Sequence, residues 1–224
     1  MMGYKIILTG ATGMVGKGVL LECMDAPEIE QVLLVSRRTA GINHPKVREI
    51  LVQDFFDLSA IEEDFKGYDA CFFCLGITSI GETEASYRRI TYDLSLNFAR
   101  SFIKYNENSI FCYVSGTGTD SSEKGKIMWA RIKGKTVNEL LKMPFKKAYM
   151  FRPGYIQPQK GIKSKTKWVQ AMYTLFWPVY SILKHFPGTA TNTTNMGLAM
   201  INSLTADYPK HVLGSKEINE LALK

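Results

Sequence analysis

The chain has 224 residues, of which 46% are hydrophobic, 12% aromatic and 22% charged. This composition is typical of a folded globular domain and excludes a disordered chain, a small disulfide-stapled scaffold and most multidomain architectures. The net charge of +7 is unevenly distributed, because residues 124–167 contain 13 Lys or Arg and one acid, whereas the remaining residues contain 15 bases and 20 acids. A partner attracted by positive charge is therefore expected to bind at 124–167.

Apolar strand patterns alternate with helical patterns along most of the chain. We expect strands at 5–9, 31–35, 47–52, 70–75, 110–114 and 147–151. We expect helices at 14–24, 58–65, 83–105 and 126–141. This alternation predicts parallel strands joined by right-handed crossovers, and the nearly continuous apolar strands predict helices on both faces of the sheet. The sequence therefore indicates an α/β fold with a Rossmann-type doubly wound parallel sheet.

The pattern changes after Pro153, where loops are followed by helices expected around 166–186 and 194–204. We interpret residues 155–224 as a small C-terminal helical cap on the substrate side of a single domain that comprises residues 1–224. The uncharged stretch 168–183 is short for a membrane span and contains a proline, so a buried or interfacial helix is expected there.

The cysteine pattern favours reduced core residues over disulfides or metal ligands. Cys71 and Cys74 fall in one predicted strand, where residues three apart point to opposite faces. The three histidines have no metal-ligand spacing to cysteines or acids, so no metal site is expected. Together with the lack of a secretory signal pattern at the N-terminus, this predicts a cytoplasmic protein.

A glycine triplet lies between the first strand and the first helix, in Thr9-Gly10-Ala11-Thr12-Gly13-Met14-Val15-Gly16. Gly10 allows a tight turn, Gly13 lets the backbone approach a pyrophosphate, and Gly16 lets the helix pack closely on the strand. Backbone N–H groups at the helix start then bind the phosphates. We predict a dinucleotide site that includes Gly10, Ala11, Thr12, Gly13, Met14 and Val15. The alternative is a purely structural turn.

The second strand ends in Ser36-Arg37-Arg38. An NAD site usually places an acid here for the ribose 2′-hydroxyl, whereas an arginine suits the 2′-phosphate of NADP. Because no acid occupies residues 36–39, we predict NADP as the cofactor, with NAD as the less favoured choice. The alternative is a solvated pair of arginines.

Residues after the third and fourth strands complete the predicted cofactor site. Asp54, followed by Phe55, either accepts a hydrogen bond from the adenine amine or is the acid at the start of the next helix. Leu75 and Gly76 begin a turn that continues to Thr78, where small residues let the chain pass under the cofactor.

These motifs resemble the short-chain dehydrogenase/reductase superfamily, in its extended or atypical epimerase-like branch. The resemblance covers essentially the whole chain and includes Thr9–Gly16, Asp54, Leu75-Gly76 and Arg152-Pro153-Gly154. Within that branch the chain resembles the Tat-interacting-protein-like NADP-binding reductases and the bacterial NAD-dependent epimerase/dehydratase family. The resemblance places Pro153, in the R-P-G motif, beside the cofactor.

The resemblance also implies a catalytic Ser, Tyr and Lys, with the Tyr four residues before the Lys on one helical face. Ser115 and Lys133 match the Ser and the Lys, but Trp129 stands where the Tyr is expected. An indole N–H does not ionise near neutral pH, so it cannot replace a phenol in proton transfer. Tyr155, beside R-P-G, is our candidate substitute. We interpret the Y-x-x-x-K at Tyr180–Lys184 as a chance match.

Our functional hypothesis is an NADP(H)-dependent oxidoreductase or epimerase-like enzyme acting on a small apolar substrate. Ser115 would polarise the substrate, Lys133 would position the cofactor ribose, and another group would move the proton. Because Trp129 replaces the usual Tyr, the alternative is a non-catalytic NADP(H)-binding redox sensor or scaffold. An oligomer is compatible with either hypothesis.

The basic segment 124–167 has three interpretations. It is a solvated surface, a region that attracts an anionic substrate or cofactor, or, with residues 160–186, a peripheral contact to acidic lipid. We predict no nucleic-acid partner, because no recognition motif accompanies the charge.

Overall fold

A parallel sheet of seven strands forms the centre of the computed structural model, which describes residues 3–162 and 188–224. The strands are β1 (Tyr4–Thr9), β2 (Ile29–Ser36), β3 (Val47–Leu51), β4 (Ala70–Phe73), β5 (Ile110–Val114), β6 (Lys147–Arg152) and β9 (Val212–Gly214). Their order is β3-β2-β1-β4-β5-β6-β9, and every neighbouring pair is parallel. The strand order reverses between β1 and β4, so a ligand crevice is expected beyond the carboxyl ends of these strands.

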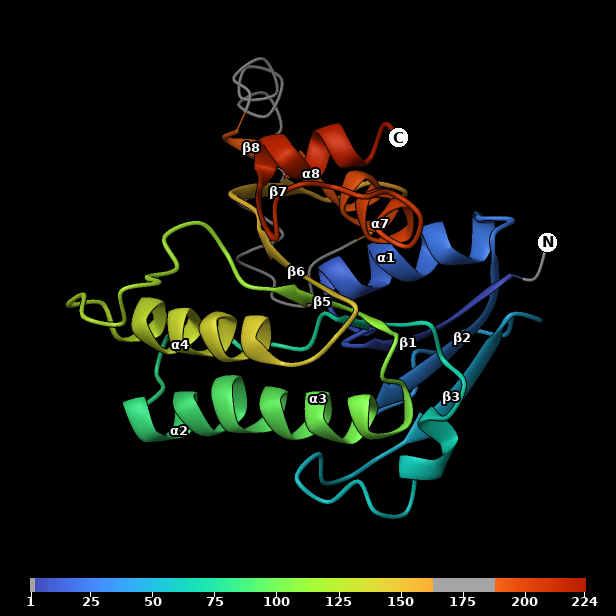
Figure 1. The fold of residues 1–224 in the computed structure, drawn as a ribbon, viewed down its shortest axis with the longest axis horizontal. Helices are drawn as coiled ribbons and strands as arrows, with labels where there is room; N and C mark the ends of the chain where they lie inside the picture. The colour runs from blue at the N-terminus through green and yellow to red at the C-terminus, as the bar shows by residue number, and fades with distance from the viewer. Residues whose placement is uncertain (1–2, 163–187) are drawn as a thin grey trace.

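Helices cover both faces of this sheet (Figure 1). One layer contains α1 (Met14–Asp25), α7 (Thr193–Asn202) and α8 (Ser215–Leu221). The other contains α2 (Glu84–Arg88), the π-helical turn η2 (Arg89–Asp93), α3 (Leu94–Tyr105) and α4 (Met128–Lys142). The smaller elements are the 3-10 turn η1 (Glu62–Phe65) and the parallel pair β7 (Tyr155–Gln157) and β8 (Ala190–Asn192). The predicted Rossmann-type α/β fold is confirmed.

Alternating residues of each strand enter two separate apolar layers. Ile6 and Leu8 of β1 are fully buried with Val19 of α1, whereas Ile7 between them is buried with Phe98 of α3 on the opposite face. Such alternation follows from the two-residue period of a strand. It explains why the strands read as continuous apolar runs.

The helix expected at 83–105 is present as the uninterrupted succession of α2, η2 and α3. Thr83 caps its start by accepting a hydrogen bond from the Ser86 backbone N–H at 3.2 Å. The helix expected at 58–65 is reduced to η1, and before it the Asp57 carboxylate accepts hydrogen bonds from both the backbone N–H and the hydroxyl of Ser59 in a turn. Local side-chain bonding of this kind competes with helix formation.

The C-terminal segment differs from the expected cap. Helix α7 confirms the helix predicted at 194–204, but its Met196, Ala199 and Met200 are buried in the core layer shared with α1. Strand β9 extends the sheet beyond the six strands predicted. We missed β9 because three residues are too few to show a periodic pattern. The described part of 155–224 is therefore built largely into the sheet and its helix layer, while the helix expected at 166–186 lies outside the described residues.

The four cysteines are free, as predicted. Cys71 is buried in the layer that contains α3, and Cys74 packs against the layer that contains α1, so the two point to opposite faces. Across residues 3–162 and 188–224, no helix is both long and apolar enough to cross a membrane.

Candidate functional site

The glycine turn between β1 and α1 requires glycine for steric reasons. Gly10 has a φ of +73°, and a Cβ atom added there would lie 2.6 Å from the carbonyl of Cys74, the residue that follows β4. The Gly13 backbone N–H donates to the Gly10 carbonyl at 2.9 Å, and a Cβ at Gly16 would collide with that same carbonyl. The glycines therefore permit a tight turn and close packing of α1 on the sheet.

The start of α1 is suited to bind an anion. No side chain caps this helix, and its first turn contains no acid, so the backbone N–H groups of that turn are not neutralised by a carboxylate. Such a helix end favours a phosphate through hydrogen bonds and the helix dipole. Met14 and Val15 lie in this first turn.

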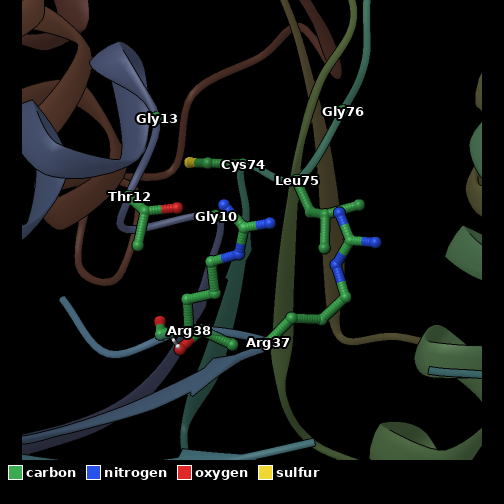
Figure 2. A pocket seen from close by; sticks show the side chains of 9 residues that line it. Gly10, Thr12, Gly13, Arg37, Arg38, Cys74, Leu75 and Gly76 are labelled. Atoms are coloured by element: carbon green, nitrogen blue, oxygen red, sulfur yellow. Dashed lines mark hydrogen bonds between the residues drawn. The ribbon is translucent and has the colours of Figure 1, made fainter. Parts of the chain in front are cut away.

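A cavity of about 300 Å³ lies in front of the turn (Figure 2). It is lined by Gly10, Thr12 and Gly13 from the turn, by Ser36, Arg37 and Arg38 from the end of β2, and by Cys74, Leu75 and Gly76 after β4. The cavity therefore lies at the predicted strand-order reversal and brings together three segments that are far apart in the sequence.

Arg37 and Arg38 face this cavity without acidic partners. Figure 2 shows both side chains extending from the end of β2, with the Arg38 guanidinium beside Gly10 and that of Arg37 beside Leu75. Both residues are exposed, and neither forms an ion pair with another described residue. Two free guanidinium groups make this rim strongly attractive to a phosphate.

Ser36 has a different position from the one we expected for a ligand contact. Its side chain is buried, and its hydroxyl donates to the Arg38 carbonyl at 2.8 Å. Oε1 of Glu49 is a second acceptor for the same hydroxyl, 3.2 Å from its oxygen. Glu49 also accepts from the Ala40 backbone N–H at 2.8 Å. Ser36 and Glu49 thus fix the loop that carries the two arginines.

A second cavity of about 310 Å³ adjoins the first, because Arg37, Leu75 and Gly76 line both. Its other walls include Asp54, Phe55, Phe56 and Arg89, with the Arg89 guanidinium 4.6 Å from the centre of the Phe56 ring. This mixture of an aromatic face, a carboxylate and guanidinium groups suits a polar heterocyclic base.

The structure argues against one of the two interpretations of Asp54. Its carboxylate accepts a hydrogen bond from the Phe56 backbone N–H at 2.8 Å, and the next helical turn begins only at Glu62. Asp54 is therefore not the acid at the start of that helix. Thr78 is exposed, accepts a hydrogen bond from the Ile80 backbone N–H at 3.3 Å, and does not line either cavity.

Ser115 and Lys133 lie next to each other at the end of β5. The Lys133 Nζ donates to the Val114 carbonyl at 3.4 Å, and Ser115 is the residue joined to that carbonyl. The backbone N–H and the hydroxyl of Ser115 both donate to the Phe151 carbonyl of β6, at 2.8 and 3.1 Å. Helix α4 and strand β5 thus bring together the two residues predicted to act on the substrate and ribose.

The ammonium group of Lys133 lies in apolar surroundings. Its Nζ is 5.6 Å from the centre of the Tyr113 ring, and no carboxylate of the described residues forms an ion pair with it. Burial, which disfavours the charged form, lowers the pKa of Lys133 to about 8. Lys133 therefore changes charge within the range in which enzymes transfer protons.

Trp129 lies one helical turn before Lys133 and packs against the loop after β5. Gly118 in that loop has a φ of +89°, and a Cβ atom there would lie 3.1 Å from Cη2 of the Trp129 ring. The indole therefore fills the space over Gly118. Position 129 of α4 thus has an indole and no ionisable side chain.

The R-P-G segment holds the loop after β5 from the opposite side. Nη2 of Arg152 donates to the Ser121 hydroxyl at 2.7 Å, and the Pro153 carbonyl accepts from the Thr117 backbone N–H at 2.9 Å. Nε of Arg152 is buried without a hydrogen-bond partner in the described part of the chain, and burial lowers the pKa of this side chain. Pro153 thus lies beside the loop that begins at Ser115.

Tyr155 lies on β7, where its hydroxyl donates to Oε1 of Gln157 at 2.7 Å. Gln157 is almost completely buried. The phenolic proton is therefore directed toward a neighbouring side chain of the same strand. The pair Tyr180–Lys184 lies outside the described residues.

Several cavity residues were missed from the sequence, among them Arg89 and Cys74. Arg89 falls in a predicted helix; it is the first residue of the π-helical turn η2, and its guanidinium lies over the Phe56 ring. Cys74 looked like a core residue, yet it lines the first cavity because β4 ends one residue earlier. Neither left a motif in the sequence that could have identified it. No group of three or more potential metal ligands occurs within the described ranges.

Comparison with known proteins identifies several distant relatives, although no protein-family model matches the chain. Protein HTATIP2 of Rattus norvegicus is 25% identical over 171 residues, which are 75% of this chain and 69% of that protein. The mitochondrial protein fmp52 of Emericella nidulans is 25% identical over 207 residues, which are 89% of this chain and 86% of that protein.

Solved structures of similar fold are dehydrogenases, reductases and related nucleotide-binding enzymes. Uronate dehydrogenase from Agrobacterium tumefaciens gives a TM-score of 0.68 at 14% identity and covers 95% of this chain and 76% of its own. L-Sorbose reductase from Gluconobacter frateurii, solved with NADPH and L-sorbose, gives 0.62 at 13% identity, with coverages of 90% and 89%. These likenesses show that the chain shares the Rossmann-type fold of these dehydrogenases and reductases.

Ser115 follows β5 and Lys133 lies on α4, as the resemblance implied, whereas Trp129 differs from the residue that it implied. The resemblance implied a Tyr on the helix of the Lys, and α4 carries an indole at that place. The predicted cytoplasmic location stays a prediction, because fungal relatives are named as mitochondrial proteins.

Proposed function

We propose that this chain is a short-chain dehydrogenase/reductase-like protein that binds NADP(H) and acts as an oxidoreductase or epimerase-like enzyme on a small, apolar substrate. One observation supports the cofactor choice most strongly: two arginines without ionic partners in the described chain extend from the end of β2 into the cavity bordered by the uncapped start of α1, Arg38 beside Gly10 and Arg37 beside Leu75. Solved relatives in fold include complexes with NADPH and with NAD, so the choice between them depends on this chain's own residues.

The residues around the two cavities fit a dinucleotide. The turn Gly10–Val15 would hold the diphosphate, Arg37 and Arg38 would hold the 2′-phosphate, and Ser36 would fix their loop. Asp54 and Phe55 would contact the adenine, while Leu75 and Gly76, followed by Thr78, would pass under the cofactor. Lys133 and Pro153 would lie at its nicotinamide end.

For catalysis, we propose that Ser115 orients the substrate oxygen and that Lys133 binds the nicotinamide ribose. The cofactor supplies or accepts a hydride when bound. Tyr155 stays the phenol predicted from the sequence as a proton donor, although its hydroxyl donates to Gln157. The proposal treats residues 1–224 as one NAD(P)-binding domain, with the segment from 155 onward on the substrate side.

A carbonyl-reduction screen tests the enzymatic part of this proposal. Purified protein would be mixed with NADPH and a panel of apolar aldehydes and ketones, and NADPH consumption would be followed by its absorbance. We expect consumption with at least one substrate. Binding of NADPH without consumption across the panel would favour the alternative function.

That alternative is a non-catalytic NADP(H)-binding redox sensor or scaffold. Trp129 favours it, because the indole is firmly packed on Gly118 and provides no ionisable group. The variant Trp129→Tyr discriminates between the two functions. If it creates activity that the native chain lacks, the native protein did not rely on superfamily chemistry.

The basic segment fits a largely solvated and ion-paired surface. Arg131, Lys142, Lys147 and Lys160 all pair with acids, among them Glu84, Glu139, Asp207 and Glu22. We propose that the remaining charge near Lys133 favours an anionic cofactor. A lipid contact through 160–186 falls mostly outside the described residues and, like an oligomer and the cytoplasmic location, stays a prediction.

A further inference from the structure

The region around β5, α4 and β6, which we call the catalytic half, has no tyrosine at position 129. It does have a cationic side chain, Lys133, one turn further along α4. Lys133 is directed at the end of β5, next to Ser115, and it has no acidic partner in the described chain. We propose that Lys133 itself donates the proton in carbonyl reduction, the role that a Tyr at position 129 would otherwise have. This inference rests on the proposed function, because it assigns a proton donor to that reaction.

The position of the ammonium group supports this role. Its only hydrogen bond to the described protein is a long one, 3.4 Å to the Val114 carbonyl, so most of its donor capacity is available. Ser115 follows Val114 directly, so a substrate oxygen held by Ser115 would lie within reach of the same Nζ. Trp129 lies one turn earlier on α4, where its ring packs over Gly118 in the loop that follows Ser115.

The protonation state of Lys133 fits a donor at physiological pH. Burial lowers its pKa to about 8, and no opposite charge counteracts this effect. The titratable groups nearby are the phenols of Tyr113, under the Nζ, and of Tyr87, which acts on Tyr113. Burial raises the pKa of both phenols, so both stay neutral and only Lys133 changes charge near pH 8.

Other candidate donors are less suitable. The Ser115 hydroxyl donates to the Phe151 carbonyl, and the Tyr155 hydroxyl donates to Gln157. The indole of Trp129 does not release a proton near neutral pH. Among the candidate side chains, the Lys133 ammonium thus combines a free donor with a suitable pKa.

The proposed step is balanced in atoms and charge. Bound NADPH supplies the hydride to the carbonyl carbon and is oxidised to NADP⁺, while the substrate is reduced. The Lys133 ammonium breaks one N–H bond and passes that proton to the carbonyl oxygen, which becomes the alcohol hydroxyl. Lys133 is left as the neutral amine, and solvent returns its proton.

The first experiment measures the titration of Lys133 without any cofactor. Trace acetylation of the purified chain with acetic anhydride at increasing pH, read by peptide mass spectrometry, gives the amine fraction of each lysine. We expect Lys133 to titrate near pH 8. Lys142 on the same helix is the control, because its ion pair with Glu139 raises its pKa. Titration of Lys133 together with Lys142 would overturn the inference.

The second experiment separates charge from proton release. Lys133→Arg keeps a positive charge for the ribose, but a guanidinium with a pKa above about 12 does not deprotonate. We expect this variant to bind NADPH while its reduction rate falls by about 100-fold or more. Lys135→Arg, two residues further along α4, is the matched control and should keep the native rate.

The pH profile gives an independent reading. Because the ammonium is the active form, the reduction rate should fall as pH rises through about 8, and Tyr155→Phe should keep that break. An active native chain whose Lys133→Arg variant keeps its rate would overturn this inference alone. A native chain that binds NADPH but reduces no carbonyl would refute the proposed enzymatic function, and the proton role with it.

Discussion

The cofactor half and the catalytic half of the molecule follow the superfamily pattern to different degrees. Around β1, α1 and β2, the glycine turn, the uncapped helix and the arginines have the arrangement that dinucleotide binding requires. Around β5, α4 and β6, Ser115 and Lys133 are brought together, but Trp129 stands where a phenol is expected. The comparison teaches that cofactor binding and proton transfer are separable properties of this fold.

The physical reason lies in what each half depends on. Phosphate binding uses backbone N–H groups in a turn that only glycine fits. Substitution of these glycines would therefore destroy the site. Proton transfer depends on one ionisable group of suitable pKa, and a nearby residue with a shifted pKa is able to provide it. Lys133 has that property here.

The largest expected effect comes from Gly10→Ala, which would break the cofactor half. A positive φ costs an L-residue about 1–2 kcal/mol, and overpacking against the Cys74 carbonyl adds about 1–3 kcal/mol. We expect lost NADPH binding and a fall in the free energy of unfolding, measured by urea denaturation. Gly67→Ala, with a φ of +81° and open space around its Cβ, is the control and should lose only the smaller amount.

Ser115→Ala tests the catalytic half. If the hydroxyl stabilises charge on the substrate oxygen, kcat/KM should fall by about 100- to 1,000-fold. The loss of its hydrogen bond to Phe151 should lower the free energy of unfolding by only about 1 kcal/mol. A variant that is less stable but fully active would show that Ser115 serves only to hold β5 against β6.

The double substitution Arg37→Ala and Arg38→Ala should abolish the preference of the cofactor half for NADPH. Losing charged hydrogen bonds worth about 1.5–3 kcal/mol raises the Kd for NADPH by about 10- to 100-fold. NADH, which lacks the 2′-phosphate, should bind as before. Arg100→Ala, an exposed arginine on α3, serves as the control in the same calorimetric titration. Equal weakening of both cofactors would contradict a 2′-phosphate contact.

Asp54→Asn should have the smallest effect. An asparagine oxygen can still accept from the Phe56 backbone N–H, so the turn should keep its shape. Weakening of one hydrogen bond to adenine, worth about 0.5–1.5 kcal/mol, should raise the Kd of NADPH and NADH equally, by about tenfold at most. A change for only one of them would place Asp54 near the 2′ position instead.

Much of the fold could be predicted because local patterns and tertiary needs agree. Local sequence patterns predict their own elements at three places: the glycine spacing of the first turn, the apolar runs such as that of β5, and the long helical periodicity of 83–105. Short elements could not be predicted in this way. Strand β9 becomes a strand only because its three residues pair with β6, a contact between residues 62 positions apart.

The candidate site shows the same division. Gly10, Arg37 and Lys133 were identifiable because a motif or spacing marks them, and the structure brings them to the predicted edges of the sheet. Arg89 was not identifiable, because it reaches the second cavity only through the tertiary packing of its helix beside Asp54, Phe55 and Phe56. Likewise, no sequence pattern shows that the Ser36 hydroxyl donates a hydrogen bond to the Arg38 carbonyl in its own loop.

Calorimetric titration of the native chain with NADPH and with NADH tests the central claim most directly. Arginines that bind the 2′-phosphate should make NADPH bind tighter than NADH by about tenfold or more, the equivalent of one charged hydrogen bond. This preference should disappear in the Arg37→Ala and Arg38→Ala double variant. Equal affinities in the native chain, or tighter binding of NADH, would contradict the account.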